Sequence, residues 1–299
     1  MSNKIKNPEV KRIIATIEQI PTLPIVSQQI MKLLNDEDVA IKEITEVIEK
    51  DPSLAVKVLK VANAPFYGTM SHITSIDHAL AILGLNEIKA ILLAFSIHNF
   101  FQSSEFEGID RKRFWKHSVV CSQVAKYLSH HFKQSPNDAL FLAALIHDMG
   151  KIVFDQFFHD DFVKIVSLVN ENGITFSKAE KRILGVTHCQ VAAKILQKWH
   201  FPRSVIAQVY YHHSPWLDKN HSSGSVIIYL ANVIAKFTGF TSLDSEPVPD
   251  IDRFIDSKVM EFIVKAGYNM DEKALRDIVR QIMEMIYAEG RDMLTLFEE

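Results

Sequence analysis

Apolar residues recur at helical spacing along most of the chain. In the segment 52–62, Ala55, Val58, Leu59 and Ala62 occupy positions i, i+3, i+4 and i+7, which is the pattern of an amphipathic helix. Comparable stripes predict helices over the segments 39–48, 75–83, 87–101, 111–130, 136–154, 160–170, 177–184, 187–199, 203–213, 225–237 and 275–286. No alternation typical of strands and no internal repeat accompanies them, so we predict an all-α fold.

Two polar segments divide this series of helices. The first, 102–110, contains a glycine, and the second, 238–252, combines a glycine with prolines. They predict an N-terminal helical bundle over 1–108 that packs on a second helical core over 109–240. A C-terminal loop and helical extension, 241–299, follows the core.

Composition narrows the classes of function. The chain has 299 residues, of which 47% are hydrophobic, and its net charge of −3 argues against nucleic acid as a partner. Cys121 and Cys189 are too few for a disulfide framework, so we expect buried thiols in a reducing cytosol. The N-terminus lacks the apolar segment of a signal peptide, and the longest apolar runs are far shorter than the roughly 20 residues that span a bilayer. We therefore expect a cytoplasmic protein without membrane contact.

Histidines fall on the apolar faces of four predicted helices. They are His117, His147, His188 and His213, with His212 adjacent to the last. A single histidine in such a place is usually a hydrogen-bonded core residue. Burying several would cost about 1–3 kcal/mol for each one left unpaired, whereas a shared zinc, iron or manganese ion would satisfy several at once. The sequence gives helix faces but not helix adjacency, so a metal site and a hydrogen-bonded core both stay open.

Two further polar pairs have a simpler interpretation. Ser177 with Glu180, and Thr187 with Gln190, match the capping-box pattern at the start of a helix. On this pattern Glu180 is expected to begin a helix rather than to bind a ligand.

The order of these residues resembles the HD phosphohydrolase superfamily. It runs His117, then His147 and Asp148 within HDMGK, and then the downstream histidines. The stretches PTLPIVSQQIMKLLND, DPSLAVKVLKVANAPFYG, ITSIDHALAILGLNEIKAILL and RFWKHS together resemble the HDOD family, the HD-related output domain of bacterial signalling proteins, over about 18–240. This resemblance implies an N-terminal helical bundle packed on an HD-like helical core.

The resemblance also implies roles for individual residues. The metal ligands would be His117, His147, Asp148, His188, His212 and His213. Lys151 would contact phosphate, and catalysis, if the site were active, would rest on Asp148 and Lys151. The implied cofactor is a divalent iron, manganese or zinc ion, and no organic cofactor is expected.

Two departures from the superfamily pattern weaken the expectation of catalysis. Asn232 stands where the superfamily closes its site with an aspartate, so it would offer a metal a neutral oxygen without negative charge. After His213 the chain continues SPWLDKNHSSG, which lacks the glutamate and the GYP-type motif of the enzymes that cleave cyclic di-GMP. That activity is therefore not expected.

The family is generally regarded as regulatory. We accordingly expect a non-catalytic signalling module that acts by protein–protein binding, with signalling proteins as partners. A nucleotide ligand and a homodimer remain open. The alternative is a metal-dependent phosphohydrolase that acts on a nucleotide or another phosphoester.

Overall fold

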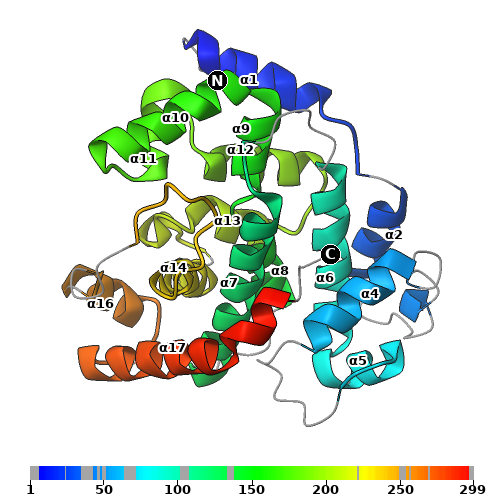
Figure 1. The fold of residues 1–299 in the computed structure, drawn as a ribbon. Helices are drawn as coiled ribbons and strands as arrows, with labels where there is room; N and C mark the ends of the chain where they lie inside the picture. Colours follow the sequence, from blue (N-terminus) through cyan, green and yellow to red (C-terminus); the bar gives the residue numbers. More distant parts are fainter. Residues whose placement is uncertain are drawn as a thin grey trace.

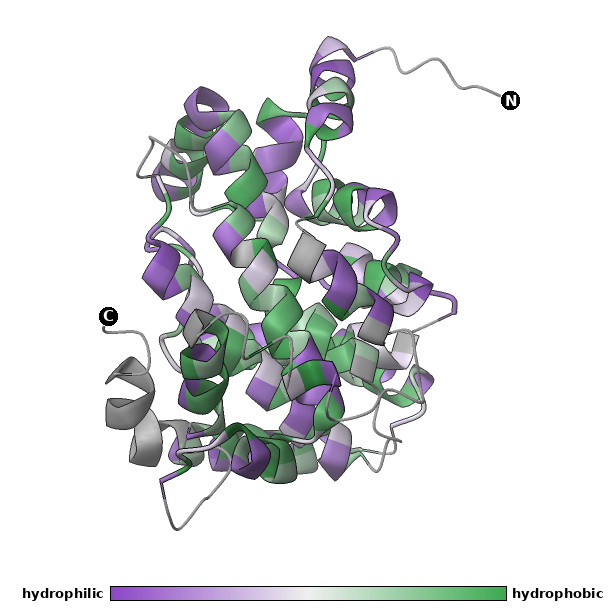
Figure 2. Ribbon diagram, turned by 90° about the vertical axis from the view of Figure 1, so that its right-hand side faces the viewer, coloured by the Kyte–Doolittle hydropathy of each residue, from purple (hydrophilic) through white to green (hydrophobic). Residues whose placement is uncertain are grey.

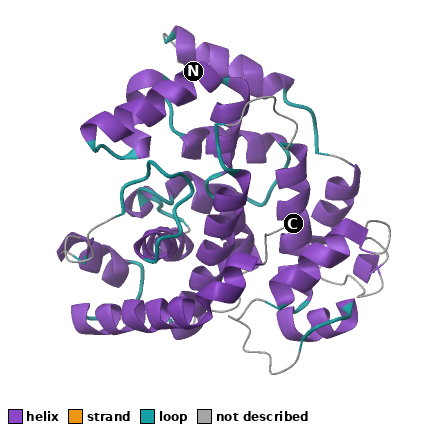
Figure 3. Ribbon diagram, in the orientation of Figure 1, coloured by secondary structure: helices purple, strands orange, loops and turns teal. Residues whose placement is uncertain are grey.

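Helices make up most of the chain that the structure describes. The computed structural model describes residues 7–23, 25–34, 43–45, 48, 52–63, 72–101, 108–132, 138–220, 222–248, 254–255, 257–268 and 270–295. Within these ranges no residue forms a strand, and Figure 3 shows helices joined by loops and turns. The predicted all-α fold is confirmed. Most of the stripe at 39–48, the segment 64–71 and the loop positions 102–107 and 249–253 lie outside the described residues.

The first group of helices surrounds α6. It consists of α2 (Ile25–Leu34), α4 (Pro52–Ala62), α5 (Ile76–Leu83) and α6 (Leu85–Phe100). Helices α2, α4 and α5 pack against α6, which packs in turn against α8 (Asp138–Ile146) in the centre of the molecule (Figure 1). Helix α6 is therefore the element that joins this group to the core.

Helix α1 (Pro8–Gln19) packs elsewhere, on the second group of helices. The Lys198 ammonium donates to the carbonyl oxygens of Ile17, Glu18 and Ile20 at 3.2, 2.6 and 2.6 Å, which caps the end of α1. Arg12 pairs with Asp161 from another helix of the same group. The predicted division of the chain near residues 108 and 240 stays a prediction. Helix α1 belongs to the predicted N-terminal bundle by sequence, but it packs on helices that follow residue 108.

The second group forms the centre of the molecule. Its elements are α7 (Arg111–His131), α8, α9 (Met149–Phe157), α10 (His159–Asn172), α11 (Phe176–Ile183), α12 (His188–Lys198), α13 (Arg203–Tyr211), the 3-10 turn η2 (Pro215–Leu217) and α14 (Ser222–Phe237). Helix α7 packs against both α8 and α14, while α12 packs against α9 and α13. Hydrophobic residues concentrate on these central helices (Figure 2).

Two C-terminal helices lie against this core. They are α16 (Ser257–Lys265) and α17 (Glu272–Thr295). Helix α17 packs on α7, where Tyr127 donates a hydrogen bond of 2.9 Å to Gln281. The extension after 240 is therefore packed on the core at this point.

The prediction of one continuous helix over 136–154 is wrong in one respect, because a turn at His147–Asp148 interrupts the helix. Helix α8 ends at Ile146, and α9 begins at Met149. In an unbroken helix, neighbouring residues point about 100° apart. The turn instead brings the side chains of His147 and Asp148 to one point, where their Nε2 and Oδ2 atoms lie 3.5 Å apart.

Gly150 allows α9 to approach α12 at this turn. A Cβ atom at this position would collide with the backbone carbonyl of His188. The glycine of HDMGK is thus required by the close contact between two backbones.

Among the described residues, no single helix has the length and apolar composition needed to cross a bilayer. Helices α5 and α6 reach that length only together, as a pair bent by 111°.

Candidate metal centre

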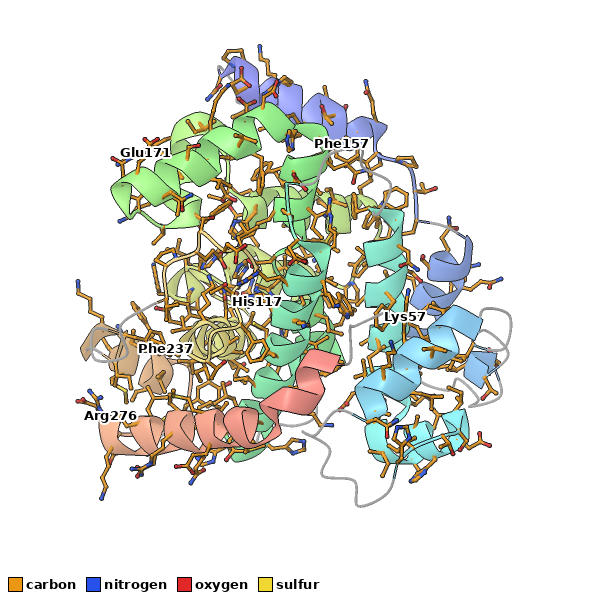
Figure 4. All side chains as sticks on the ribbon, in the orientation of Figure 1. Lys57, His117, Phe157, Glu171, Phe237 and Arg276 are labelled. Carbon is orange, nitrogen blue, oxygen red and sulfur yellow. The ribbon has the colours of Figure 1, made fainter. Side chains whose placement is uncertain are left out.

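Four buried imidazoles meet in the middle of the second group of helices. His117 comes from α7, His147 from the turn after α8, His188 from the first residue of α12 and His212 from the end of α13. All four are fully buried. His117 Nε2 lies 3.3 Å from His147 Nε2, and His188 Nε2 lies 3.4 Å from His212 Nε2. Figure 4 places His117 in this central cluster of nitrogen atoms.

Asp148 lies between the two pairs of histidines. Its Oδ2 atom faces the first pair, at 3.6 Å from His117 Nε2 and 3.5 Å from His147 Nε2. Its Oδ1 atom faces the second pair, at 3.2 Å from His188 Nε2 and 3.5 Å from His212 Nε2. One carboxylate thus contacts every ring of the cluster.

Hydrogen bonds to the outer ring nitrogens orient these imidazoles. In His117, His147 and His212, Nδ1 lies 2.7–2.8 Å from a backbone carbonyl oxygen. In His188, Nδ1 lies 2.8 Å from both carboxylate oxygens of Glu180. Because a carbonyl oxygen only accepts hydrogen bonds, Nδ1 carries the hydrogen and the Nε2 lone pair points inward. Histidines that bind metals are held in this way by their second nitrogen.

The residues present fit a divalent cation. Lone pairs that face one another at 3.3–3.4 Å repel unless a proton or a cation lies between them. The buried acceptor Asn232 Oδ1 also lacks a hydrogen-bond donor. Imidazole nitrogens and carboxylate oxygens suit zinc, iron and manganese, and any of these ions would satisfy the converging lone pairs.

The two halves of the cluster differ in proton affinity. Burial lowers the pKa of His117 to about 4, although Asp148 opposes the shift, and burial likewise holds the pKa of His147 well below its usual range. Burial acts in the same direction on His212, but the negative charge of Cys189 and the hydrogen bond to Asp148 outweigh it and raise the pKa of His212 to about 9. A cation that binds to the second half therefore competes with protons.

Lys151 is enclosed by oxygen atoms rather than open to a ligand. Its ammonium donates to Asp148 Oδ2 at 2.7 Å, to Ser242 Oγ at 2.8 Å and to Glu246. These three contacts use all three ammonium hydrogens, and the side chain is fully buried. Lys236 also reaches Glu246, at 3.3 Å.

The oxygens of Ser242 and Glu246 come from the loop that follows α14. This loop lies between α14 and α11 (Figure 1, gold). It was predicted only as a connection. Ser242 and Glu246 contact Lys151 from this loop, and the carbonyl of Phe240 accepts from His117 Nδ1. No signal in the sequence indicated that these residues belong to the site.

The last two predicted ligands lie at the edge of the cluster. The ring of His213 is 4.2 Å from that of His212 between centroids and is only partly buried. His213 and Asn232 line a pocket of about 460 Å³ together with Lys236 and Glu246. Five of the seven predicted ligands therefore form the cluster itself, while His213 and Asn232 connect it to this pocket.

Glu180 was misinterpreted in the sequence. Helix α11 begins at Phe176, without a side-chain cap, so the predicted Ser177–Glu180 capping box is wrong. Glu180 is instead fully buried and accepts from the backbone N–H of His188 at 3.0 Å as well as from its ring. The sequence did contain a signal that Glu180 is buried, because Glu180 shares the apolar face of its helix with Phe176 and Ala179. The second box is supported by a hydrogen bond of 3.0 Å from the Thr187 N–H to Gln190.

Replacing Glu180 with glutamine should weaken metal binding about 10–100-fold, the usual loss when an outer partner of a ligating histidine is changed. The amide preserves the shape but removes the charge that fixes the ring of His188. Zinc affinity measured by competition with a chromogenic chelator checks this. Glu87→Gln, which removes an ion pair with Lys126 outside the cluster, should leave the affinity unchanged.

The sequence of the chain is related to those of known proteins. The sequence model of one family, described as the HDOD domain, matches residues 20–215. An uncharacterized protein of Treponema pallidum is 24% identical over 226 residues, which are 74% of this chain and 43% of that protein. The YuxH protein of Bacillus subtilis is 39% identical over 61 residues, 20% of this chain and 15% of that protein. The chain thus spans less than half the length of these curated relatives.

Solved structures share the fold. An HDOD domain protein of Geobacter sulfurreducens superposes with a TM-score of 0.82 at 23% identity, covering 97% of this chain and 98% of its own. A candidate phosphohydrolase of Shewanella amazonensis gives 0.74 at 20% identity, covering 95% and 97%. A candidate signal transduction protein of Marinobacter aquaeolei gives 0.71 at 22% identity, covering 96% and 64%. At these identities the likeness concerns the fold alone.

Proposed function

The chain belongs to the HDOD family, and we propose that it is a regulatory module in which the metal centre stabilises the core rather than catalysing a reaction. Its partners would be signalling proteins, and its location would be the cytoplasm. The match to the HDOD family supports this class of function. The solved structures that share the fold include a candidate signal transduction protein and a candidate phosphohydrolase, and the second is the alternative.

The observation that carries the proposal is the position of Glu246. Its carboxylate contacts both Lys151 and Lys236, the two lysines that lie at the cluster. A phosphoester hydrolase needs cationic groups to neutralise the phosphate in the transition state. Here a carboxylate of the chain itself already pairs with both lysines, and Lys151 has no ammonium hydrogen left to donate.

Asn232 adds a second argument in the same direction. It stands where the resemblance expects an aspartate, and its buried amide oxygen is neutral. A metal that receives less negative charge from its protein ligands binds more weakly.

The proposed metal is a single or paired divalent ion, of zinc, iron or manganese, held by the four imidazoles and Asp148. Such an ion can act as a Lewis acid or as a structural cross-link between helices. In this chain the ligands come from α7, the α8–α9 turn, α12 and α13, so metal bound in the cluster would join four separate elements. The cross-linking role is the one we propose.

The full chain, loaded with zinc, manganese or ferrous iron, should not hydrolyse phosphomonoesters, nucleotides or cyclic dinucleotides by a reaction that requires His147. The test compares the wild type with His147→Ala, and His131→Ala serves as a matched control because that histidine lies on the surface at the end of α7. Metal-dependent turnover that is lost in His147→Ala and retained in His131→Ala would overturn the proposal.

One observation favours the alternative, a metal-dependent phosphohydrolase. The pocket of about 460 Å³ reaches His213 and Asn232 and is walled by the aromatic rings of Trp216, Tyr229 and Phe254. A planar base could stack on such rings while its phosphates point to Lys236. Calorimetric titration of nucleotides separates the cases: binding without turnover supports a regulatory ligand site, and binding with turnover supports the enzyme.

A further inference from the structure

A thiol lies within the second half of the cluster. Cys189 follows His188 in the first turn of α12 and is buried. Its Sγ atom lies 3.4 Å from His188 Nε2 and 4.0 Å from His212 Nε2. Together with a ring nitrogen of His213, these atoms form a group in which every ligand atom lies within 4.8 Å of the others.

Two of the spacings within this group match a tetrahedral metal site. Nitrogen at about 2.0–2.1 Å and sulfur at about 2.3 Å from zinc lie roughly 3.3–3.6 Å apart when the geometry is tetrahedral. The Nε2 atoms of His188 and His212 are 3.4 Å apart, and Sγ is 3.4 Å from the first of them. Sγ is 4.0 Å from His212 Nε2, and a ring nitrogen of His213 lies within 4.8 Å of the other three atoms, so rotations of the Cys189 and His213 side chains would complete the set.

We propose that Cys189 is a metal ligand and that it completes a three-histidine, one-cysteine site with His188, His212 and His213. The inference rests on the metal centre of the proposed function and adds to it a sulfur donor, which the resemblance did not supply. On binding, the metal displaces the proton that the imidazoles of His188 and His212 share with the Cys189 thiolate. That proton passes to solvent, and a lone pair of the thiolate sulfur forms the bond to the metal, with no change in oxidation state.

Two consequences distinguish this site from one made of imidazoles and carboxylate alone. A thiolate favours zinc over manganese, because soft ligands bind manganese poorly. Four protein ligands also leave no open position for water or substrate, which is typical of structural zinc sites and agrees with a non-catalytic role. The position of Cys189 in the first turn of a helix favours its thiolate form.

Cys121 offers a matched control within the same chain. It is equally buried and also contacts a histidine of the cluster, with Sγ at 3.5 Å from His117 Nε2 and 4.0 Å from His117 Nδ1. A sulfur at similar distances from both nitrogens lies beside the ring or over its face rather than in line with the Nε2 lone pair, where a metal would bind. Cys121 is therefore not assigned as a ligand.

The test is cobalt(II) substitution of the full chain, with metal content measured separately. A near-ultraviolet thiolate-to-cobalt charge-transfer band should appear in the wild type and in Cys121→Ser, and should be absent from Cys189→Ser and Cys189→Ala. Zinc affinity should fall at least about 100-fold in the Cys189 variants, at or beyond the upper end of losses caused by outer partners. Circular dichroism confirms that each variant is folded.

Other outcomes overturn the inference in distinguishable ways. Cobalt bound to the wild type without the band, or a band lost in Cys121→Ser and retained in Cys189→Ser, removes Cys189 as a ligand but leaves the metal centre in place. Failure of the wild type to bind cobalt or zinc at all removes the metal centre as well. If the Cys189 variants do not fold, X-ray absorption at the zinc edge on Cys121→Ser decides, since one sulfur at about 2.3 Å is then expected from Cys189.

Discussion

Asp148→Asn should lower the metal content of the protein and destabilise the fold at the same time. The carboxylate accepts from Lys151 at 2.7 Å and faces the Nε2 atoms of four histidines at 3.2–3.6 Å. Removing one partner of a buried ion pair costs about 3–5 kcal/mol. We expect the free energy of unfolding to fall by about 3 kcal/mol, the lower end of this range, because Glu246 still pairs with Lys151 after the substitution.

The metal measurement isolates the role of Asp148 in the cluster. After equilibration with zinc and dialysis, elemental analysis should find less zinc per chain in the variant than in the wild type. Asp155→Asn is the matched control, because Asp155 is also fully buried and pairs with Arg111 at 3.2 Å and His159 at 3.1 Å, outside the cluster. It should lose stability but keep its metal. Equal metal content in both variants would contradict the proposed centre.

Lys151→Met should lower the free energy of unfolding of the chelator-treated protein by about 3–5 kcal/mol. Methionine has a similar length but no charge, so Asp148 and Glu246 would remain buried without their shared cation. Urea unfolding with and without zinc measures the loss. Zinc should restore part of the stability, since the ion neutralises Asp148.

Glu246 gives this prediction an internal control. Glu246→Gln in the Lys151→Met background should recover stability, with a coupling energy of about 0.5–3 kcal/mol between the two positions. Strictly additive effects would show that the two residues act independently, contrary to the contact between them.

The same carboxylate should give the fold a defined pH dependence. Burial opposes ionisation of Glu246, but Lys151 and Lys236 outweigh it and hold its pKa well below the usual range. A carboxylate with a lowered folded pKa stabilises the protein above its unfolded pKa, and this contribution is lost as the pH falls. The difference in unfolding free energy between the wild type and Glu246→Gln should therefore shrink by about 1 kcal/mol between pH 5 and pH 3.5.

The helical periodicity of the sequence predicted the elements that carry the cluster, and local errors have physical causes. His117 and His188 were placed on the correct buried faces because a helix face depends only on the spacing of nearby residues. The break at His147–Asp148 was missed because no glycine or proline precedes it. Glu180 was missed because its spacing from Ser177 matches a capping box, while its partner His188 belongs to the next helix.

The sequence by itself determined the all-helical fold, the inward direction of the histidines and their resemblance to an HD-type ligand set. Only the tertiary structure decided which faces meet, that Asp148 lies between two pairs of imidazoles, and that Cys189 joins the second pair. It also decided that Glu246 closes over Lys151, a contact between residues 95 positions apart in the chain. Periodicity is set by neighbours within a few residues, whereas such a contact depends on how the intervening helices pack.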